Sequence, residues 1–362
     1  MTSTFDQRPQ LVFWETTKAC ELSCIHCRAV SQSNPSPDEM SLDDSLMFLS
    51  SLKSFGNSPV LILTGGNVML RNNIGEIVKS IGRNSIPAAA SPAVSDSLTP
   101  ESIQNMISNG IHSFSISLDG KKAFHDMVRG SGSYFRTIDA VEILKQNGAR
   151  LQINTLVTAD NIYDLPFILK WLVENGIKVW EIFFLVRAGR GVNLQDLNKE
   201  EYEGVCMFLV FASGYGINIR TVEGPYFRVL AKRHNDGIME DANPVVEKMR
   251  NIAESMIASP REKDYKIPIA GTSDGNGIIF VGHDGSVYPS GFLPLKVGSI
   301  LEKPISEIYR NSDLLLALRD RKNLAGRCRS CEYREVCGGS RARAFHYTGS
   351  VLGEDPLCPV GI

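Results

Sequence analysis

The stretch Cys20-Glu21-Leu22-Ser23-Cys24-Ile25-His26-Cys27 decides how the rest of this chain is interpreted. It carries three thiols on one short loop and follows Leu11-Val12-Phe13-Trp14, an apolar run that predicts a first β-strand. Cysteines spaced this closely, in a chain without an export signal, indicate a metal centre rather than disulfides. The remaining sequence has to show what these thiols hold.

The composition is that of a globular chain with little net charge. Its 362 residues carry a formal net charge of -2, which gives no reason to expect nucleic acid or a membrane surface as the main partner. The N-terminus lacks the charged start and apolar run of an export signal, and no apolar stretch approaches the roughly 18 residues needed to span a bilayer. We expect a cytoplasmic protein that binds neither nucleic acid nor membrane.

Seven of the eight cysteines fall into two groups, with three at 20–27 and four at 328–358. This grouping indicates two metal centres, one toward each end of the chain. Cys206 stands alone within the apolar run Val205-Cys206-Met207-Phe208-Leu209 and is predicted to be a buried helix residue.

Short β-branched or aromatic runs alternate with longer helical patterns from residue 11 to about residue 220. The pattern predicts parallel strands joined by right-handed crossovers, which an open sheet and a barrel both satisfy. The predicted strands are Leu11–Glu15, Val60–Thr64, Ile86–Ala90, Ser113–Leu118, Leu151–Val157, Trp180–Val186 and Gly216–Thr221, and the predicted helices lie around 41–55, 73–83, 100–109, 134–147, 162–175 and 199–213.

Polar and glycine-rich segments follow the predicted strands. Functional side chains gather at the carboxyl ends of parallel strands, so this placement marks a candidate site. The segments are the cysteine stretch, Gly65-Gly66-Asn67, Ser117-Leu118-Asp119-Gly120, Asn154 and Arg187.

The second half of the chain loses the alternation. Residues 222–277 are mixed and polar, with one helical pattern around 244–257. Strands are predicted at Ile278–Val281 and Ser286–Tyr288, because Asp284-Gly285 between apolar runs is a hairpin signal. We therefore expect three segments: a barrel at 1–221, a bridge at 222–277 and a small cysteine-rich domain at 278–362.

The spacing Cys20-x3-Cys24-x2-Cys27 has two interpretations. Structural zinc sites are closed by four ligands, and His26 is poorly placed as the fourth because it lies between two of the cysteines. Three sulfurs suit three irons of a cubane cluster and leave the fourth iron open. We favour iron–sulfur over zinc.

The same residues resemble the signature of the radical S-adenosylmethionine (SAM) superfamily, with His26 just before the last cysteine. The resemblance extends over nearly the whole chain. It implies a partial (β/α)6 barrel, a [4Fe-4S] cluster held by Cys20, Cys24 and Cys27, and SAM bound at the open iron. His26 would then lie among the cofactor-binding residues.

Further segments resemble the SAM-binding parts of that superfamily. Gly65 and Gly66 resemble the stretch that binds the SAM amino group, where glycine lets backbone approach the ligand. Family members often have Glu or Asp next, whereas Asn67 offers less charge assistance to an ammonium. Ser117-Leu118-Asp119-Gly120, His125-Asp126 and Arg129-Gly130 resemble a segment of members with a SPASM or twitch extension. The resemblance implies SAM contacts from Ser117 and Arg129 to the carboxylate, with Asp119 and Asn154 nearby.

The reaction that the resemblance implies begins with reductive cleavage of SAM to methionine and a 5′-deoxyadenosyl radical, which abstracts a substrate hydrogen. An external reductant such as ferredoxin or flavodoxin would supply the electron. The sequence does not identify a catalytic side chain beyond the cofactor-binding ones.

The second group, Cys328-x2-Cys331-x5-Cys337-x20-Cys358, supplies four thiolates. A zinc ribbon fits this count as well as a closed cubane does. The pattern resembles a SPASM/twitch domain, which implies auxiliary clusters. Ser290 and Ser340 stand where a second set would need cysteine, and serine is a poor ligand for soft metals, so we expect one auxiliary [4Fe-4S] cluster.

The substrate is open between two classes. Residues 337–358 resemble most the branch that modifies tetrapyrrole side chains in haem and haem d1 synthesis, and seven arginines between 319 and 343 suit propionates, unless they form a solvated face. The alternatives are a peptide-modifying maturase and a non-catalytic iron–sulfur electron carrier. The expected partner is therefore a small molecule or a peptide.

Overall fold

The computed structural model describes residues 5–238, 242–258, 262 and 264–360, and the chain divides into two compact units. Unit 1 comprises Met1–Ile116, Phe135–Leu151 and Thr272–Asp320, and unit 2 comprises Ser117–Tyr134, Gln152–Gly271 and Arg321–Ile362. Each unit is assembled from separated segments. The division into 1–221, 222–277 and 278–362 stays a prediction, and its outer bounds lie outside the described residues.

A mostly parallel sheet forms the centre of unit 1. Strand β1 (Leu11–Glu15) pairs in parallel with β2 (Val60–Thr64) on one side and with β8 (Ile278–Val281) on the other. Beyond β2 follow β3 (Ala88–Ala90) and β4 (Ser113–Ser117), and beyond β8 follow the antiparallel β9 (Ser286–Tyr288) and β10 (Gly298–Ser299).

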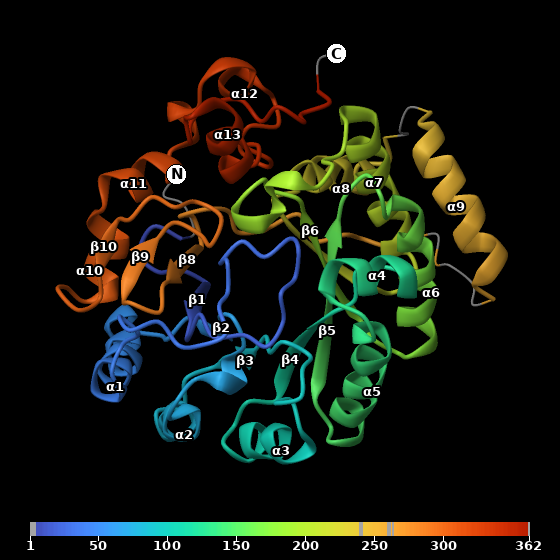
Figure 1. The fold of residues 1–362 in the computed structure, drawn as a ribbon. Coiled ribbons are helices and arrows are strands. Elements are labelled where there is room, and N and C mark those ends of the chain that lie inside the picture. The colour runs from blue at the N-terminus through green and yellow to red at the C-terminus, as the bar shows by residue number, and fades with distance from the viewer. Residues whose placement is uncertain (1–4, 239–241, 259–261, 263, 361–362) are drawn as a thin grey trace. The chain divides into compact units, whose positions relative to one another are not determined.

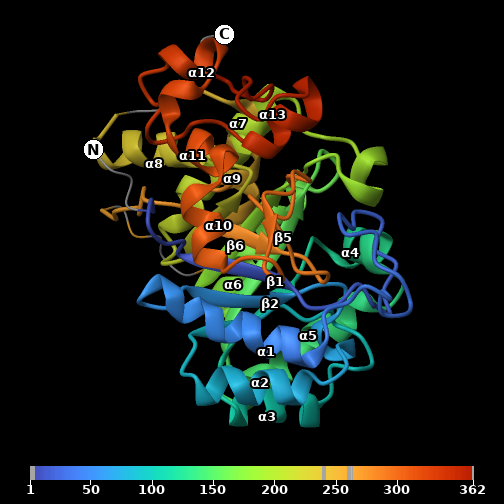
Figure 2. The same cartoon turned by 90° about the vertical axis from the view of Figure 1, so that its left-hand side faces the viewer.

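Helices of unit 1 cover the outer side of these strands, as Figures 1 and 2 show for α1 (Leu42–Ser51), α2 (Ile74–Arg83) and α3 (Pro100–Ser108). Ser41 caps α1 by accepting a hydrogen bond from the Asp44 amide, and Thr99 forms a capping box with Ser102 at α3. The helices α10 (Ile305–Asn311) and α11 (Asp313–Arg319) follow the hairpin, and 3-10 turns lie at Leu52–Phe55 and Val68–Leu70. The core contains Trp14 against Phe48, with ring centroids 5.2 Å apart.

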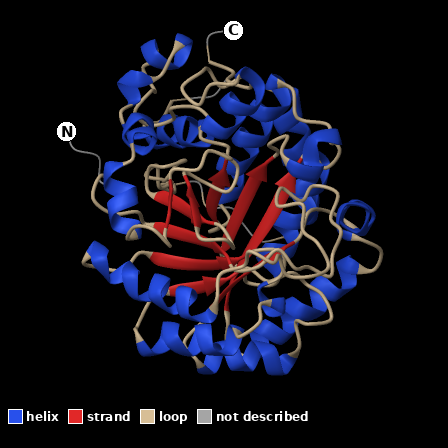
Figure 3. Ribbon diagram, turned by 60° about the vertical axis from the view of Figure 1, so that its left-hand side comes forward, coloured by secondary structure: helices blue, strands red, loops and turns tan. Residues whose placement is uncertain are grey.

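Three parallel strands form the centre of unit 2, namely β5 (Arg150–Val157), β6 (Val179–Phe184) and β7 (Asn218–Val222). The helices α6 (Leu165–Glu174), α7 (Lys199–Ser213), α8 (Tyr226–Asn235) and α9 (Pro244–Met256) pack with one another beside them (Figure 3). The remaining elements are α4 (Lys122–Arg129), α5 (Ser133–Gln146), α12 (Gly326–Ser330), α13 (Arg341–Thr348) and 3-10 turns at Ile162–Asp164, Gly189–Asn193 and Arg321–Asn323. None of the described helices is long and apolar enough to cross a membrane.

The predicted alternation of strands and helices is confirmed. Strands β1, β2, β8 and β9 and helix α7 begin and end at the predicted residues. Cys206 is fully buried in α7, as predicted. The sequence did not indicate α4, α8 or α10–α13, and it did not indicate that the 278–288 hairpin joins the same sheet as β1.

Candidate functional site

Backbone hydrogen bonds close the three-cysteine loop of unit 1 at its base. The amide of Cys20 donates to the carbonyl of Gln32 (2.8 Å), and the Gln32 amide donates to the Lys18 carbonyl (3.1 Å). Within the loop, the Cys27 amide donates to the Cys24 carbonyl (3.2 Å). These bonds fix where the loop starts, turns and returns, so its three half-buried thiols lie on one short, closed segment.

The three thiols interact electrostatically. Burial first, and then the neighbouring Cys24 and Cys27, raise the pKa of Cys20, against the opposing effect of the Leu22 amide 3.4 Å from its sulfur. Thiolates crowded in this way repel one another until a cation binds them. The all-sulfur donor set therefore fits a soft metal centre such as an iron–sulfur cluster. His26 lies half-buried between Cys24 and Cys27.

Gly65 and Gly66 press against the backbone that leads into the loop. The Gly66 amide donates to the Thr17 carbonyl (2.7 Å), and the next amide, of Asn67, donates to the Ala19 carbonyl (2.6 Å). A Cβ on Gly65 would lie 2.5 Å from the Thr17 oxygen, and one on Gly66 would overlap the Ala19 and Lys18 oxygens. Glycine is required here by the fold itself, which fixes this turn beside the cysteine loop.

Asn67 is fully buried and its side chain is bonded at both ends. Its Nδ2 donates toward Glu21 Oε2 (2.8 Å), Ser95 Oγ (3.0 Å) and Ser97 Oγ (2.7 Å). Its Oδ1 accepts from the amides of Met69 and Ala93. Partial burial raises the pKa of Glu21, but hydrogen bonds from Ser95, Asn67 and Ser97 outweigh it and leave that pKa below its usual value.

In unit 2, Asp119 and Arg129 form a buried pair. Arg129 Nε donates to Asp119 Oδ2 (2.5 Å), and the Leu156 amide donates to Asp119 Oδ1 (2.9 Å). Asp119 is fully buried, whereas the Arg129 side chain keeps 18% of its exposure. Asp119 therefore orients the guanidinium from the buried side and leaves it partly accessible.

Two further residues support this pair: His125, which belongs to the segment that resembles the family, and Asn161, which the sequence did not single out. Asn161 Nδ2 donates to the Asp119 carbonyl (2.6 Å), and His125 Nδ1 accepts from the Asp119 amide (3.1 Å). Burial lowers the pKa of His125 to about 4, so its ring is neutral at pH 7 and able to accept that bond. Ser117 ends β4 next to this segment in the sequence and is half-buried.

A row of polar side chains crosses the three strands of unit 2. Asn154, Glu181 and Arg220 are in register on β5, β6 and β7. Gln152 Nε2 donates to Asn154 Oδ1 (2.8 Å) and to Glu181 Oε2 (2.9 Å), while its Oε1 accepts from Arg220 (2.9 Å). Burial raises the pKa of Glu181 to about 7, against the opposing effects of Arg220 and Gln152. Asn154 is thus one member of a connected polar network.

All four C-terminal cysteines line one cavity of about 380 Å³ in unit 2, together with Tyr202, Tyr226 and the backbone of Gly338 and Gly339. Burial raises the pKa of Cys337 to about 12, so a metal has to displace its proton on binding. Four thiols around one cavity fit a closed cluster, which takes one cysteine at each iron.

Asp355 ties the cavity wall together. Both oxygens of its carboxylate accept from one nitrogen, Arg343 Nη1, at 3.1 Å each, and Oδ2 also accepts from the Ser340 amide (2.8 Å). The Asp355 backbone carbonyl accepts from the Cys358 amide (3.1 Å). Asp355 is 2% exposed and Arg343 is fully buried. Asp355 therefore links the segments that carry Cys337 and Cys358.

The serines that replace cysteine have structural roles. Ser340 caps α13, with its Oγ accepting from the Arg343 amide (2.9 Å) and donating to Glu223 (2.5 Å). Ser290 is buried in unit 1, and its Oγ accepts from the Phe292 amide (3.2 Å).

The seven arginines do not form one solvated face. Arg319, Arg321, Arg341 and Arg343 are buried. Arg319 donates to the carbonyls of Gly275 and Tyr309, and Arg341 donates to those of Val351 and Gly353. Arg341, Arg343 and Arg319 stabilise the protein's own backbone and carboxylates, so the hypothesis that the whole set binds propionates is not supported.

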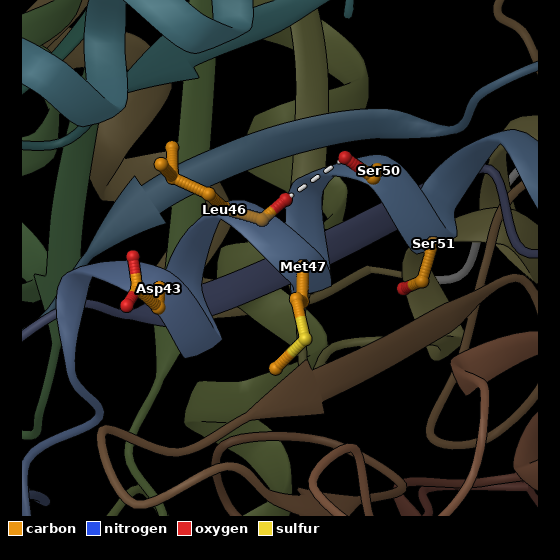
Figure 4. A pocket seen from close by; sticks show the side chains of 5 residues that line it. All are labelled: Asp43, Leu46, Met47, Ser50 and Ser51. Atoms are coloured by element: carbon orange, nitrogen blue, oxygen red, sulfur yellow. Dashed lines mark hydrogen bonds between the residues drawn. The ribbon is translucent and has the colours of Figure 1, made fainter.

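Other candidate sites are weaker. A wide, shallow hollow of about 680 Å³ lies along α1, lined by Asp43, Leu46, Met47, Ser50 and Ser51, and Figure 4 shows that Ser50 bonds back to the Leu46 carbonyl. Its lining has no cluster of reactive groups. Within the described ranges, no three His, Cys, Asp or Glu side chains converge on a single-ion site.

Two sequence profiles match the chain. Residues 14–172 match the radical SAM superfamily, and residues 273–332 match an iron-sulfur cluster-binding domain known as SPASM.

Full-length relatives are similar to this chain. AdoMet-dependent heme synthase of Nitratidesulfovibrio vulgaris is 32% identical, across 96% of this chain and 92% of the relative. The heme synthase of Methanosarcina barkeri is also 32% identical, across 97% and 96%. Pre-heme d1 synthase of Dinoroseobacter shibae is 28% identical, across 96% and 85%.

Solved structures share the fold. Streptococcus suis SuiB bound to S-adenosylmethionine superposes with a TM-score of 0.71 at 13% identity, covering 98% of this chain and 78% of that one. The protein anSMEcpe, with bound AdoMet and the Cp18Cys peptide, gives 0.66 at 16% identity, covering 96% and 93%. These two likenesses concern the fold alone.

Proposed function

We propose, from the premise that this chain belongs to the radical SAM superfamily and carries a SPASM domain, that its substrate is a tetrapyrrole and its target a carboxylate side chain. The family makes it an enzyme that binds SAM, a [4Fe-4S] cluster and auxiliary iron–sulfur. The observation that carries the substrate is the likeness, over nearly the whole chain, to synthases named for heme and heme d1.

The open cluster, when bound with SAM, supplies a 5′-deoxyadenosyl radical. Cys20, Cys24 and Cys27 hold that cluster on their closed loop, and Gly65 and Gly66 fix the neighbouring turn. In unit 2, Asp119 aims the partly accessible Arg129, which suits the SAM carboxylate. Ser117 and Asn154 complete the proposed SAM contacts, and His26 lies beside the cluster ligands.

We assign one auxiliary cluster, to Cys328, Cys331, Cys337 and Cys358. Their shared cavity supports it, and the hydrogen bonds that Ser340 and Ser290 make as serines argue against a second set of ligands. A closed cluster of four thiolates suits electron transfer or substrate positioning.

We infer that the enzyme works in the cytoplasm with a ferredoxin or flavodoxin as its reductant. None of its eight cysteines, all of which the structure describes, forms a disulfide, as a reducing compartment favours. Peptide modification is the second candidate. Its support is 24% identity, over 98% of this chain, to the mycofactocin maturase MftC of Mycolicibacterium smegmatis, and a likeness of fold at 16% identity to anSMEcpe. The tetrapyrrole has the stronger case.

The test uses anaerobically reconstituted protein with SAM, dithionite and iron-coproporphyrin III. We expect 5′-deoxyadenosine to form faster with the porphyrin, and the porphyrin to change mass. Its tetramethyl ester, which lacks free carboxylates, is the matched control and should do neither. Cys24→Ala should abolish both products, because one iron of the open cluster loses its ligand.

Porphyrin-independent cleavage of SAM, with the porphyrin unchanged, would contradict the proposal. If the porphyrin with free carboxylates and its tetramethyl ester gave the same rate of 5′-deoxyadenosine formation and the same change in mass, the carboxylate could not be the target.

A further inference from the structure

Glu21 directly follows Cys20 in the cysteine loop, and hydrogen bonds fix the position of its carboxylate. Its Oε2 accepts hydrogen bonds from Ser95 Oγ (2.5 Å), Asn67 Nδ2 (2.8 Å) and Ser97 Oγ (3.0 Å). The Ser97 amide also bonds to this carboxylate, and the residue is exposed. These neutral donors orient the group, carry no charge that would neutralise it, and leave it exposed to solvent.

Asn67 has the opposite arrangement. It is fully buried, its Oδ1 accepts from two backbone amides, and its Nδ2 is directed at Glu21 and the two serines. Its only acceptor atom is therefore committed within the protein. An incoming ammonium finds no charged partner at position 67, but finds one at position 21.

We infer that Glu21 is the carboxylate that receives the ammonium group of SAM, and that Asn67, Ser95 and Ser97 are its positioning residues. The inference rests on the SAM binding in the proposed function and deepens it. A carboxylate and an ammonium form a charge-assisted hydrogen bond, roughly twice as strong as a neutral one. Glu21 stands next to a ligand of the open cluster, where the amino-acid end of SAM binds in this family.

The direct test is the affinity of Glu21→Gln for SAM, measured by anaerobic equilibrium dialysis of protein with a full complement of iron. Gln keeps the size and one acceptor oxygen but loses the charge. We expect the Kd for SAM to rise about tenfold or more. The Kd for the analogue in which a keto oxygen replaces the amino group should not change, because that ligand has no ammonium.

Asp96→Asn is the matched control. Asp96 lies between the two serines, its carboxylate is 91% exposed, and its nearest cation is Arg136 at 3.7 Å. Asp96→Asn changes the net charge by the same amount as Glu21→Gln. It should leave the Kd for SAM within about twofold of the parent value.

Glu21→Ala is the second variant, and it decides if Glu21→Gln fails to assemble its cluster. Iron-loaded Glu21→Ala protein that binds SAM as tightly as the parent overturns the inference. So does an unchanged Kd in Glu21→Gln, or an equal loss for the keto analogue.

Failure of this inference is distinguishable from failure of the proposed function. Binding of iron-coproporphyrin III, followed by its absorbance without SAM, does not depend on Glu21. A parent protein that modifies the porphyrin while Glu21→Gln binds SAM normally refutes only the role of Glu21.

Discussion

Gly66 illustrates how the absence of one side chain joins two segments that are far apart in sequence. The turn after β2 touches the backbone of residues 17–19, so the cysteine loop and the turn have a fixed spacing. The sequence predicts that these glycines make room for a ligand. The structure shows that backbone already fills that space.

Gly66→Ala should destabilise the fold by about 1–3 kcal/mol, as overpacking does, because the added methyl meets main-chain oxygens that cannot rotate away. Thermal or denaturant unfolding of the apo protein measures this. Gly75→Ala in α2 is the control, since its nearest atom would be 3.9 Å away, and it should be neutral or stabilising by up to about 1 kcal/mol. Equal effects at the two positions would show that the contact is unimportant.

The residue scale also marks a limit of prediction. The sequence drew attention to Asn67 as a departure from its family, but it did not connect Asn67 with Glu21, 46 residues away. Hydrogen bonds between loops depend on side-chain directions that no periodicity records. Asn161, which supports Asp119, escaped notice for the same reason, and His125 was noticed without its bond to the Asp119 amide.

At the scale of elements, the polar row across β5, β6 and β7 is unusual because it places a carboxyl group in a half-buried sheet face. Glu181 has a pKa of about 7, raised mainly by burial. The folded protein therefore binds more protons than the unfolded chain between about pH 4.5 and pH 7, and stability falls as pH rises through that range.

Glu181→Gln should remove this fall in the free energy of unfolding with rising pH. Relative to the parent protein, we expect the free energy of unfolding to be unchanged near pH 4 and higher by up to roughly 3 kcal/mol at pH 8, at about 1.4 kcal/mol per pKa unit. Denaturant unfolding as a function of pH measures it. Glu174→Gln, an exposed i,i+4 partner of Lys170, is the control and should change stability by less than about 1 kcal/mol at either pH. A pH-independent difference for Glu181→Gln would contradict this account.

Capping signals explain only part of which helices were predicted. Helices α3 and α7 begin with capping boxes, and both were predicted. Helices α4 and α8, whose N-cap residues Lys121 and Pro225 make no side-chain cap, were missed, but α2 and α6 also lack such a cap and were predicted. Tertiary packing, which sequence patterns do not record, supports such helices.

At the scale of the whole molecule, residues 321–360 have little regular structure of their own. Their helices α12 and α13 have 5 and 8 residues, which is too short for stability in isolation. The four cysteines of the shared cavity lie in this region. Metal binding and local folding should therefore be coupled here.

Removing iron with a chelator should increase hydrogen exchange in residues 326–358 while leaving the buried helix α7 protected. Mass spectrometry of peptides from apo and reconstituted protein measures this. Cys331→Ala should reproduce the effect in the presence of iron and lower the iron content by about four, one cubane. Identical exchange with and without iron would show that the hydrogen bonds of Asp355 suffice.

The whole-molecule arrangement was the least predictable part. Strand order follows from alternation for β1–β4 and for β5–β7, but the joining of residues 278–281 to β1 is a pairing across most of the chain. No local signal specifies such a partner, and the two units consequently combine segments that composition alone separates.

That pairing has a consequence for synthesis of the protein. Leu11 is paired with Ile278, so the ribosome makes β1 long before one of its two neighbours exists. At roughly 5–20 residues per second, the apolar edge of β1 waits for tens of seconds beside the nascent sheet. An unpaired strand edge is a template for intermolecular pairing. The newborn chain should therefore depend on chaperones, and truncation before residue 278 should yield aggregates rather than a smaller folded protein.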